Sequence, residues 1–242
     1  ESFLSATFLV ENFSNTEIID AIEKGMKAGE EKYKVKVNLI PDIARNIPES
    51  KYAVLDLVLE GLKRGVFIGL GLGGLENGFP ADLFADVYKV AKERGLHVVA
   101  HAGEAMGAES IWSALNDLKA ERIGHGIRCI DDLDLMEYLK KHQVPMEVCP
   151  TSNYCLKVAN VNEIHPIRKM FDAGLICTLN SDDPVMFSTS LTQEYLLLLS
   201  QGFSMEELFQ LNVNAAESSF LSDANKKELI NKIYQFRKNE IK

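Results

Sequence analysis

The sequence lacks the features that mark several large classes of protein. No apolar stretch approaches the ~20 residues that a membrane-spanning helix needs, and no run of like charges suggests an interaction tail. The four cysteines show no CxxC spacing, so we expect reduced thiols rather than a disulfide framework. No basic, apolar and small-residue pattern opens the chain. We therefore expect no secretion signal, no membrane association and a cytoplasmic protein.

Positive charge is also in short supply. The chain has 26 Lys and Arg against 35 Asp and Glu, which gives a formal net charge of −9. Because an acidic surface repels a phosphate backbone, we expect no nucleic-acid partner. The sequence does not indicate an oligomeric state. What it does contain is a hydrophobic fraction of 46% over 242 residues, enough for the core of one α/β barrel or one large α/β domain.

Short apolar runs alternate with helical patterns along the whole chain. The apolar runs recur at roughly the length of one strand–helix–strand step. They are residues 3–9, 35–40, 66–72, 97–100, 122–124, 145–149 and 176–179. The clearest helical patterns are residues 14–26, 84–91, 110–118, 132–141, 205–211 and 223–237. No linker interrupts the alternation, so we expect residues 1–242 to form a single domain.

Strands that alternate with helices predict a parallel sheet. A doubly wound sheet and a closed (β/α)₈ barrel both satisfy this pattern, and the seven predicted strands are one short of the eight in a barrel. The segment 69–74 (GLGLGG) matches the dinucleotide motif GxGxxG, but the next helix begins only after Pro80. A pyrophosphate site needs a helix that opens at once. We therefore interpret the glycines as a bare strand end where a ligand can approach the backbone.

Four polar motifs stand where predicted strands end. They are HAGE at residues 101–104, RIGHG at 122–126, CPTSN at 149–153 and NSDDP at 180–184. Both parallel architectures place their active sites at the carboxyl ends of strands. The motifs bring two His, one Glu and two adjacent Asp to these ends. Such residues can bind a metal ion and move protons beside it.

Each residue of this group also has a structural interpretation. His101 and Glu104 are either a metal ligand with a proton donor, or a core histidine with a capping glutamate. His125, framed by two glycines, is by itself more typical of a turn. Asp182 and Asp183 either ligate a metal and orient a water, or cap the next helix, which Pro184 would favour.

The remaining candidates are interpreted as structural. Cys149 has no basic neighbour and precedes a proline, so we expect it to pack at the strand end. His97 starts a strand, His142 lies at a Lys-rich helix end, and His165 precedes Pro166 at a helix entry. We expect these three histidines to serve structure or to face solvent.

In their order and spacing, the four motifs resemble those of the adenosine deaminase family of metal-dependent amidohydrolases. Residues 69–221 match the family pattern nearly throughout, and the resemblance continues more weakly to the first residues. It implies a (β/α)₈ barrel with one divalent metal, usually zinc. It also implies hydrolysis of a 6-aminopurine nucleoside, with adenosine giving inosine and ammonia as the expected reaction.

The resemblance implies a role for each polar residue. Glu104 would give a proton to the purine nitrogen N1 and must then be protonated when substrate binds. His125 would position the metal-bound water and stabilise the developing alkoxide. Asp183 would hold the hydroxide and shuttle a proton toward the leaving ammonia.

Metal and substrate binding are implied in the same way. His101 and Asp182 would be zinc ligands, and the backbone at Gly74 and the Asp183 side chain would contact the substrate. The sequence departs from the family because it contains no HxH motif, which supplies two further ligands. The resemblance therefore implies an incomplete barrel that begins at strand two, and we expect little activity from this chain alone.

A second departure concerns the substrate. Family members often have Asp-Leu-Ala-Gly where this chain has residues 71–74 (GLGG), a variant found among bacterial members with varied substrates. The alternatives are therefore adenine, an N6-modified AMP or aminodeoxyfutalosine, although RIGHG favours the nucleoside branch over the adenine branch. A non-catalytic barrel remnant that only binds a ligand is an alternative of another class.

Overall fold

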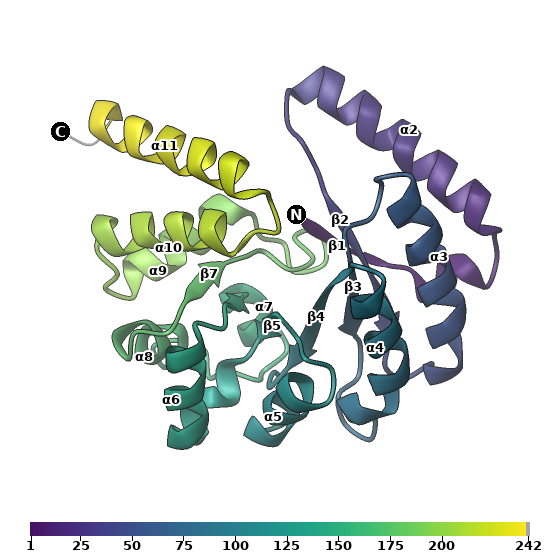
Figure 1. The fold of residues 1–242 in the computed structure, drawn as a ribbon. Coiled ribbons are helices and arrows are strands. Elements are labelled where there is room, and N and C mark those ends of the chain that lie inside the picture. Colours follow the sequence, from purple (N-terminus) through teal and green to yellow (C-terminus); the bar gives the residue numbers. More distant parts are fainter. Residues whose placement is uncertain (241–242) are drawn as a thin grey trace. The chain divides into compact units, whose positions relative to one another are not determined.

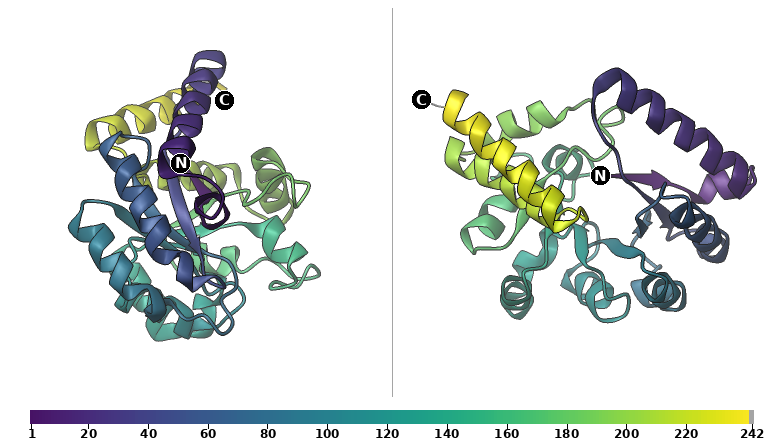
Figure 2. Two further views of the ribbon diagram at one scale, coloured as in Figure 1. Left: turned by 90° about the vertical axis from the view of Figure 1, so that its right-hand side faces the viewer. Right: turned by 45° about the horizontal axis from the view of Figure 1, so that its top comes forward.

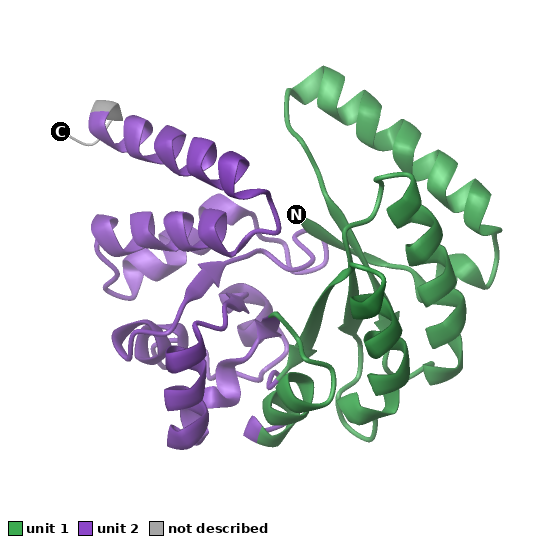
Figure 3. Ribbon diagram, viewed as in Figure 1, with its two compact units in different colours: residues 1–102, 109–121 green, residues 103–108, 122–242 purple. Residues whose placement is uncertain are grey.

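The computed structural model describes residues 1–240, and the chain clusters into two compact units (Figure 3). The first unit comprises residues 1–102 and 109–121, and the second comprises residues 103–108 and the chain from residue 122 onward. Each unit carries its own parallel strands and covering helices (Figure 1). That residues 1–242 form one barrel domain stays a prediction.

The first unit is a run of parallel strands in chain order. These strands are β1 (Ser2–Ser5), β2 (Leu39–Ala44), β3 (Gly69–Gly73) and β4 (His97–Ala102). β1 pairs with β2, β2 with β3 and β3 with β4, each time in parallel. The helices of this part of the chain are α1 (Thr7–Val10), α2 (Asn15–Tyr33), α3 (Lys51–Lys63), α4 (Ala85–Glu93) and α5 (Ala108–Asn116), with 3₁₀ turns η1 (Pro48–Ser50) and η2 (Ala81–Phe84). α3 packs on β2 and β3, and α4 packs on β3 and β4.

Two of the predicted helices begin and pack as expected. The α2 helix starts with a capping box, in which Ser14 Oγ accepts from the Glu17 N–H and the Glu17 carboxylate accepts from the Ser14 N–H. The predicted stripe that begins at Phe84 and continues along α4 is fully buried. Gly95, at φ +85°, follows the end of that helix.

The second unit has three parallel strands and most of the remaining helices. The strands are β5 (Arg122–His125), β6 (Met146–Val148) and β7 (Cys177–Leu179), paired β5 with β6 and β6 with β7. The helices are η3 (Ile127–Asp131), α6 (Leu133–His142), α7 (Pro150–Cys155), α8 (Ile167–Asp172), α9 (Leu191–Ser200), α10 (Met205–Ser218) and α11 (Asp223–Glu240). α11 lies along α10, as the views in Figure 2 show, with the Phe209 and Tyr234 rings 5.5 Å apart.

All seven predicted strands are present, and the bounds of the first two differ most from the prediction. The first ends at Ser5, because the Thr7 hydroxyl oxygen accepts a hydrogen bond from the Ala44 N–H at 2.9 Å and residues 7–10 form α1. The second begins at Leu39 rather than at residue 35, because Val35 is exposed and directly follows the left-handed residue Lys34 that ends α2. These shifts leave the strand order and the strand ends that carry the motifs unchanged.

Two predictions from composition can be compared with the described residues. The four cysteines are free thiols, which agrees with the expectation of no disulfide framework. Among the helices of residues 1–240, we find none that is both long and apolar enough to cross a bilayer.

Candidate active site

The glycine-rich segment forms β3 and does not open a helix. Residues 74–80 are irregular, and the next helical turn begins at Ala81, so the dinucleotide interpretation is wrong, as expected from the sequence. A Cβ at Gly71 would lie 3.0 Å from Asp42 Cβ and 3.1 Å from the Phe3 ring. The glycine therefore makes room for side chains of the neighbouring strands, while Gly74 takes φ +81° at the strand end.

His101 is the next-to-last residue of β4 in the first unit, and a buried arginine binds its backbone carbonyl. The Arg45 side chain is fully buried and donates to the carbonyl oxygens of His101 and Phe79, both at 2.7 Å. The Phe3 ring meets the His101 imidazole edge-on, with centroids 5.0 Å apart. Arg45 could not be found from the sequence, because the predicted strand ended at residue 40 and the two carbonyls that Arg45 binds are distant in the chain.

The second unit brings together three of the predicted residues. His125 ends β5 and is 2% exposed; its Nδ1 lies 3.3 Å from Glu104 Oε1, and its Nε2 lies 3.8 Å from Asp182 Oδ2. Asn153 on α7 joins this group, because its Nδ2 lies 3.1 Å from Glu104 Oε1 and 3.2 Å from His125 Nδ1. Glu104 and Asp182 are each about one-fifth exposed, so ligands can reach both carboxylates. We call Glu104, His125, Asn153 and Asp182 the acid–imidazole cluster.

Two members of the acid–imidazole cluster have left-handed backbones. His125 has φ +59° and Asp182 has φ +54°. Such angles cost free energy for residues other than glycine and persist where the surroundings impose them, often at functional sites. An N-capping residue normally has an extended backbone, so the left-handed angle of Asp182 agrees with a functional rather than a capping role.

The buried imidazole of His165 contacts Asn153 of the acid–imidazole cluster. It is 1% exposed, its Nε2 lies 3.2 Å from Asn153 Oδ1, and its Nδ1 accepts the Ile167 N–H at 3.2 Å. The backbone N–H of His165 donates to Gln201 Oε1 at 3.1 Å. The predicted position at a helix entry is confirmed, since α8 begins at Ile167. The contact with Asn153 could not be found from sequence spacing.

Burial lowers the pKa of His165 from its ordinary value of 6.5 to about 3. The unfolded chain therefore binds a proton between these two values that the folded chain does not bind. We expect the wild type to lose stability as the pH falls from 6.5 toward 3, with this group contributing about 1.4 kcal/mol per pH unit. Urea unfolding over this range should show a shallower loss in His165→Gln. Equal slopes in both proteins would contradict the assignment.

The NSDDP motif does not cap a helix. Residues 184–188 form turns without a helix, and α9 begins at Leu191 after Ser190, whose Oγ accepts from the Gln193 N–H. The capping interpretation of Asp182 and Asp183 is therefore wrong. The structure brings Asp182 to His125, whereas Asp183 is exposed and its carbonyl oxygen accepts from the Phe187 N–H at 3.0 Å.

Within the second unit, His125, Cys149 and Asp182 each offer a donor atom, all within 4.8 Å of one another. Burial, with Asp182 as the next contribution, raises the pKa of the Cys149 thiol well above its usual range, and the side chain is buried. The packing role predicted for Cys149 agrees with this. Imidazole and carboxylate are zinc donors, so His125 and Asp182 of the second unit fit the ion by donor type. That His101 of the first unit is a zinc ligand stays a prediction.

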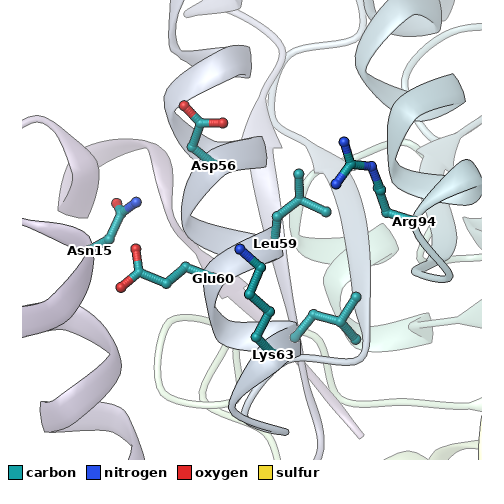
Figure 4. Close-up of a pocket in the computed structure, with 7 residues that line it drawn as sticks. Asn15, Asp56, Leu59, Glu60, Lys63 and Arg94 are labelled. Carbon is teal, nitrogen blue, oxygen red and sulfur yellow. The ribbon is translucent and has the colours of Figure 1, made fainter.

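A surface pocket of about 510 Å³ lies elsewhere in the first unit (Figure 4). It is lined by Asn15, Asp56, Leu59, Glu60, Leu62, Lys63 and Arg94. These side chains are exposed or half-buried, carry both charges and come from none of the four motifs. The pocket therefore forms no part of the candidate site.

The chain is similar in sequence to adenosine deaminases. The chain is 41% identical over 215 residues to an adenosine deaminase from Shewanella denitrificans, covering 88% of this chain and 64% of that relative. It therefore spans less than two thirds of the relative's length.

Solved structures match in fold. An adenine deaminase from Arthrobacter aurescens is similar with TM-score 0.86 and 35% identity, covering 91% of this chain and 68% of that one. A zinc-bound amidohydrolase from Burkhoderia ambifaria has TM-score 0.89 and 25% identity, covering 98% of this chain and 68% of that one. This likeness agrees with the predicted (β/α)₈-type fold, of which the described residues carry seven strands. The adenosine deaminase family profile matches residues 3–236, and the chain belongs to this family.

Proposed function

We propose that the protein with this chain hydrolyses the 6-amino group of a purine, with adenosine as the expected substrate. The observation that carries the proposal is the acid–imidazole cluster, in which Glu104 and His125 share one amide and His125 faces Asp182. A carboxylic acid beside an imidazole can protonate a ring nitrogen while the imidazole orients a water. The adenosine deaminase from Shewanella denitrificans, at 41% identity, supports this choice of substrate class.

The reaction needs a water added at the purine carbon that bears the amine, a proton delivered to N1, and ammonia released. In the proposal, Glu104 gives the proton to N1. His125 orients the attacking water and stabilises the alkoxide, and Asp183 moves a proton toward the leaving ammonia. The Gly74 backbone holds the far edge of the purine. The roles of Asp183 and Gly74 follow from the family resemblance alone.

A zinc ion is the proposed cofactor, with His101 and Asp182 as its ligands from this chain. When bound, zinc lowers the pKa of a water to ~7 and so makes hydroxide available at neutral pH. The zinc-bound amidohydrolase similar in fold supports this choice of ion. A cytoplasmic location and the absence of a nucleic-acid partner stay predictions.

The test is a comparison of substrates with zinc-loaded protein expressed from its complete coding sequence. We expect ammonia release, with kcat/KM at least about tenfold higher for adenosine than for adenine, N6-methyl-AMP or aminodeoxyfutalosine. A preference for adenine, as the name of the Arthrobacter aurescens protein would suggest, would overturn the choice of substrate and keep the chemistry. Ammonia release from none of the four would overturn the chemistry and favour the non-catalytic alternative.

A further inference from the structure

The proton positions around Asn153 can be deduced from one backbone group. The Ile167 N–H can only donate, so His165 Nδ1, at 3.2 Å, must accept. A neutral imidazole that accepts at Nδ1 carries its proton on Nε2. His165 is neutral because burial lowers its pKa to about 3. His165 Nε2–H therefore donates to Asn153 Oδ1 at 3.2 Å.

This contact fixes the direction of the Asn153 amide. Because Oδ1 accepts from His165, Nδ2 must face the other two neighbours. Its two hydrogens then point to Glu104 Oε1 at 3.1 Å and to His125 Nδ1 at 3.2 Å. Asn153 is fully buried, so a flipped amide would set its oxygen against the Glu104 carboxylate and its N–H against the His165 N–H.

The amide in turn selects the protonated atoms of the two reacting groups. His125 Nδ1 accepts from Asn153, so a neutral His125 carries its proton on Nε2, the nitrogen 3.8 Å from Asp182 Oδ2. Glu104 Oε1 also accepts from Asn153, which leaves Oε2 as the oxygen that carries the acid's proton. His125 Nδ1 also lies 3.3 Å from Glu104 Oε1, but a proton on Nδ1 for a direct ion pair would face the N–H of Asn153 Nδ2. The arrangement in which Asn153 Nδ2 donates to both groups is therefore the correct one.

We propose that Asn153, held in one orientation by His165, is a positioning residue that keeps His125 in its Nε2–H form and directs the Glu104 proton to Oε2. The inference rests on the proposed function for its catalytic meaning. His125 then offers an N–H toward the reacting oxygen, and Glu104 offers an O–H toward the purine nitrogen. Neither Asn153 nor His165 needs to touch the substrate.

The tautomer can be measured without any reaction. Protein labelled with [¹⁵N]histidine has five imidazoles, and the His125 signals are identified by their loss in His125→Gln. We expect Nε2–H for His125 in the wild type. In Asn153→Asp, which has nearly the same shape but only acceptor oxygens, we expect the proton to move to Nδ1. An Nδ1–H form in the wild type, or an unchanged tautomer in Asn153→Asp, would overturn the proposal.

The kinetic test uses His165, whose imidazole bonds Asn153 Oδ1 and the Ile167 N–H. His165→Phe keeps a ring but cannot donate, so we expect kcat to fall about tenfold, the effect of roughly one lost hydrogen bond, with KM nearly unchanged. His165→Gln keeps an N–H that can reach Asn153 Oδ1, so it should restore most of kcat. Equal kcat in the two variants, at equal folded fraction by circular dichroism, would contradict the positioning role.

The two levels of the proposal fail in different ways. If the wild type deaminates no 6-aminopurine, the proposed function is wrong, and the tautomer experiment still decides whether Asn153 orients His125. If the wild type is active and the His125 tautomer does not depend on Asn153, only the positioning role is wrong.

Discussion

Glu104→Gln is expected to lower kcat by about 10²–10⁴-fold, the usual contribution of a general acid. Glutamine has almost the same shape, and its oxygen can still accept the Asn153 N–H that Glu104 Oε1 accepts at 3.1 Å. It cannot deliver a proton to a ring nitrogen, so the loss should fall on kcat rather than on KM. Steady-state kinetics with a metal analysis of the same sample would measure both quantities.

Glu137→Gln is the matched control for this substitution. It removes the same formal charge from an exposed position on α6 in the same unit. We expect its kcat and its zinc content to equal those of the wild type. If Glu104→Gln keeps its turnover, the acid role of Glu104 is wrong. If it loses both turnover and zinc, its effect is on the metal site instead.

Arg45→Ala is expected to destabilise the protein by about 3–5 kcal/mol, the cost of breaking a buried charged network or emptying a large core position. Burial lowers the pKa of Arg45, and Glu76 partly offsets this effect. Removing the side chain leaves the carbonyl oxygens of Phe79 and His101 without the donor they have at 2.7 Å. Since one of these carbonyls belongs to a proposed zinc ligand, zinc affinity should fall as well.

Arg64→Ala separates this effect from the simple loss of an arginine. Arg64 lies in the same unit, is exposed, and pairs with Asp20 at 2.7 Å and with Glu23. Exposed ion pairs contribute little to stability, so we expect a far smaller change in the urea midpoint than for Arg45→Ala. Equal losses in the two variants would contradict the structural role assigned to Arg45.

The sequence predicted the parts of the fold that depend on local patterns. Apolar runs of strand length gave all seven strands, and the Ser14–Glu17 spacing gave the start of α2. The predicted end of the first strand failed because a long-range contact decided it. The first strand stops because the Thr7 hydroxyl bonds the Ala44 N–H, which no local pattern shows.

Some residues of the candidate site could be predicted from local sequence motifs, and others only from contacts in the folded chain. Glu104, His125 and Asp182 were found because they stand in motifs directly after strands. Asn153 stood in a motif but received no role, and His165 was set aside as structural. Their importance comes from a contact between Oδ1 and Nε2 at 3.2 Å, across α7 and the loop before α8, and only the folded chain forms it. A buried residue such as Arg45 looks like an ordinary surface arginine until the carbonyls that it binds are known.

The most direct test of the central claim is the origin of the oxygen in the product. Zinc-loaded protein from the complete coding sequence would be incubated with adenosine in water enriched in ¹⁸O, and the product would be analysed by mass spectrometry with ammonia measured in parallel. We predict inosine with one heavy oxygen and one ammonia for each inosine formed, because a water attacks the carbon that loses its amine. Failure to release ammonia, or a product without the heavy oxygen, would contradict hydrolytic deamination.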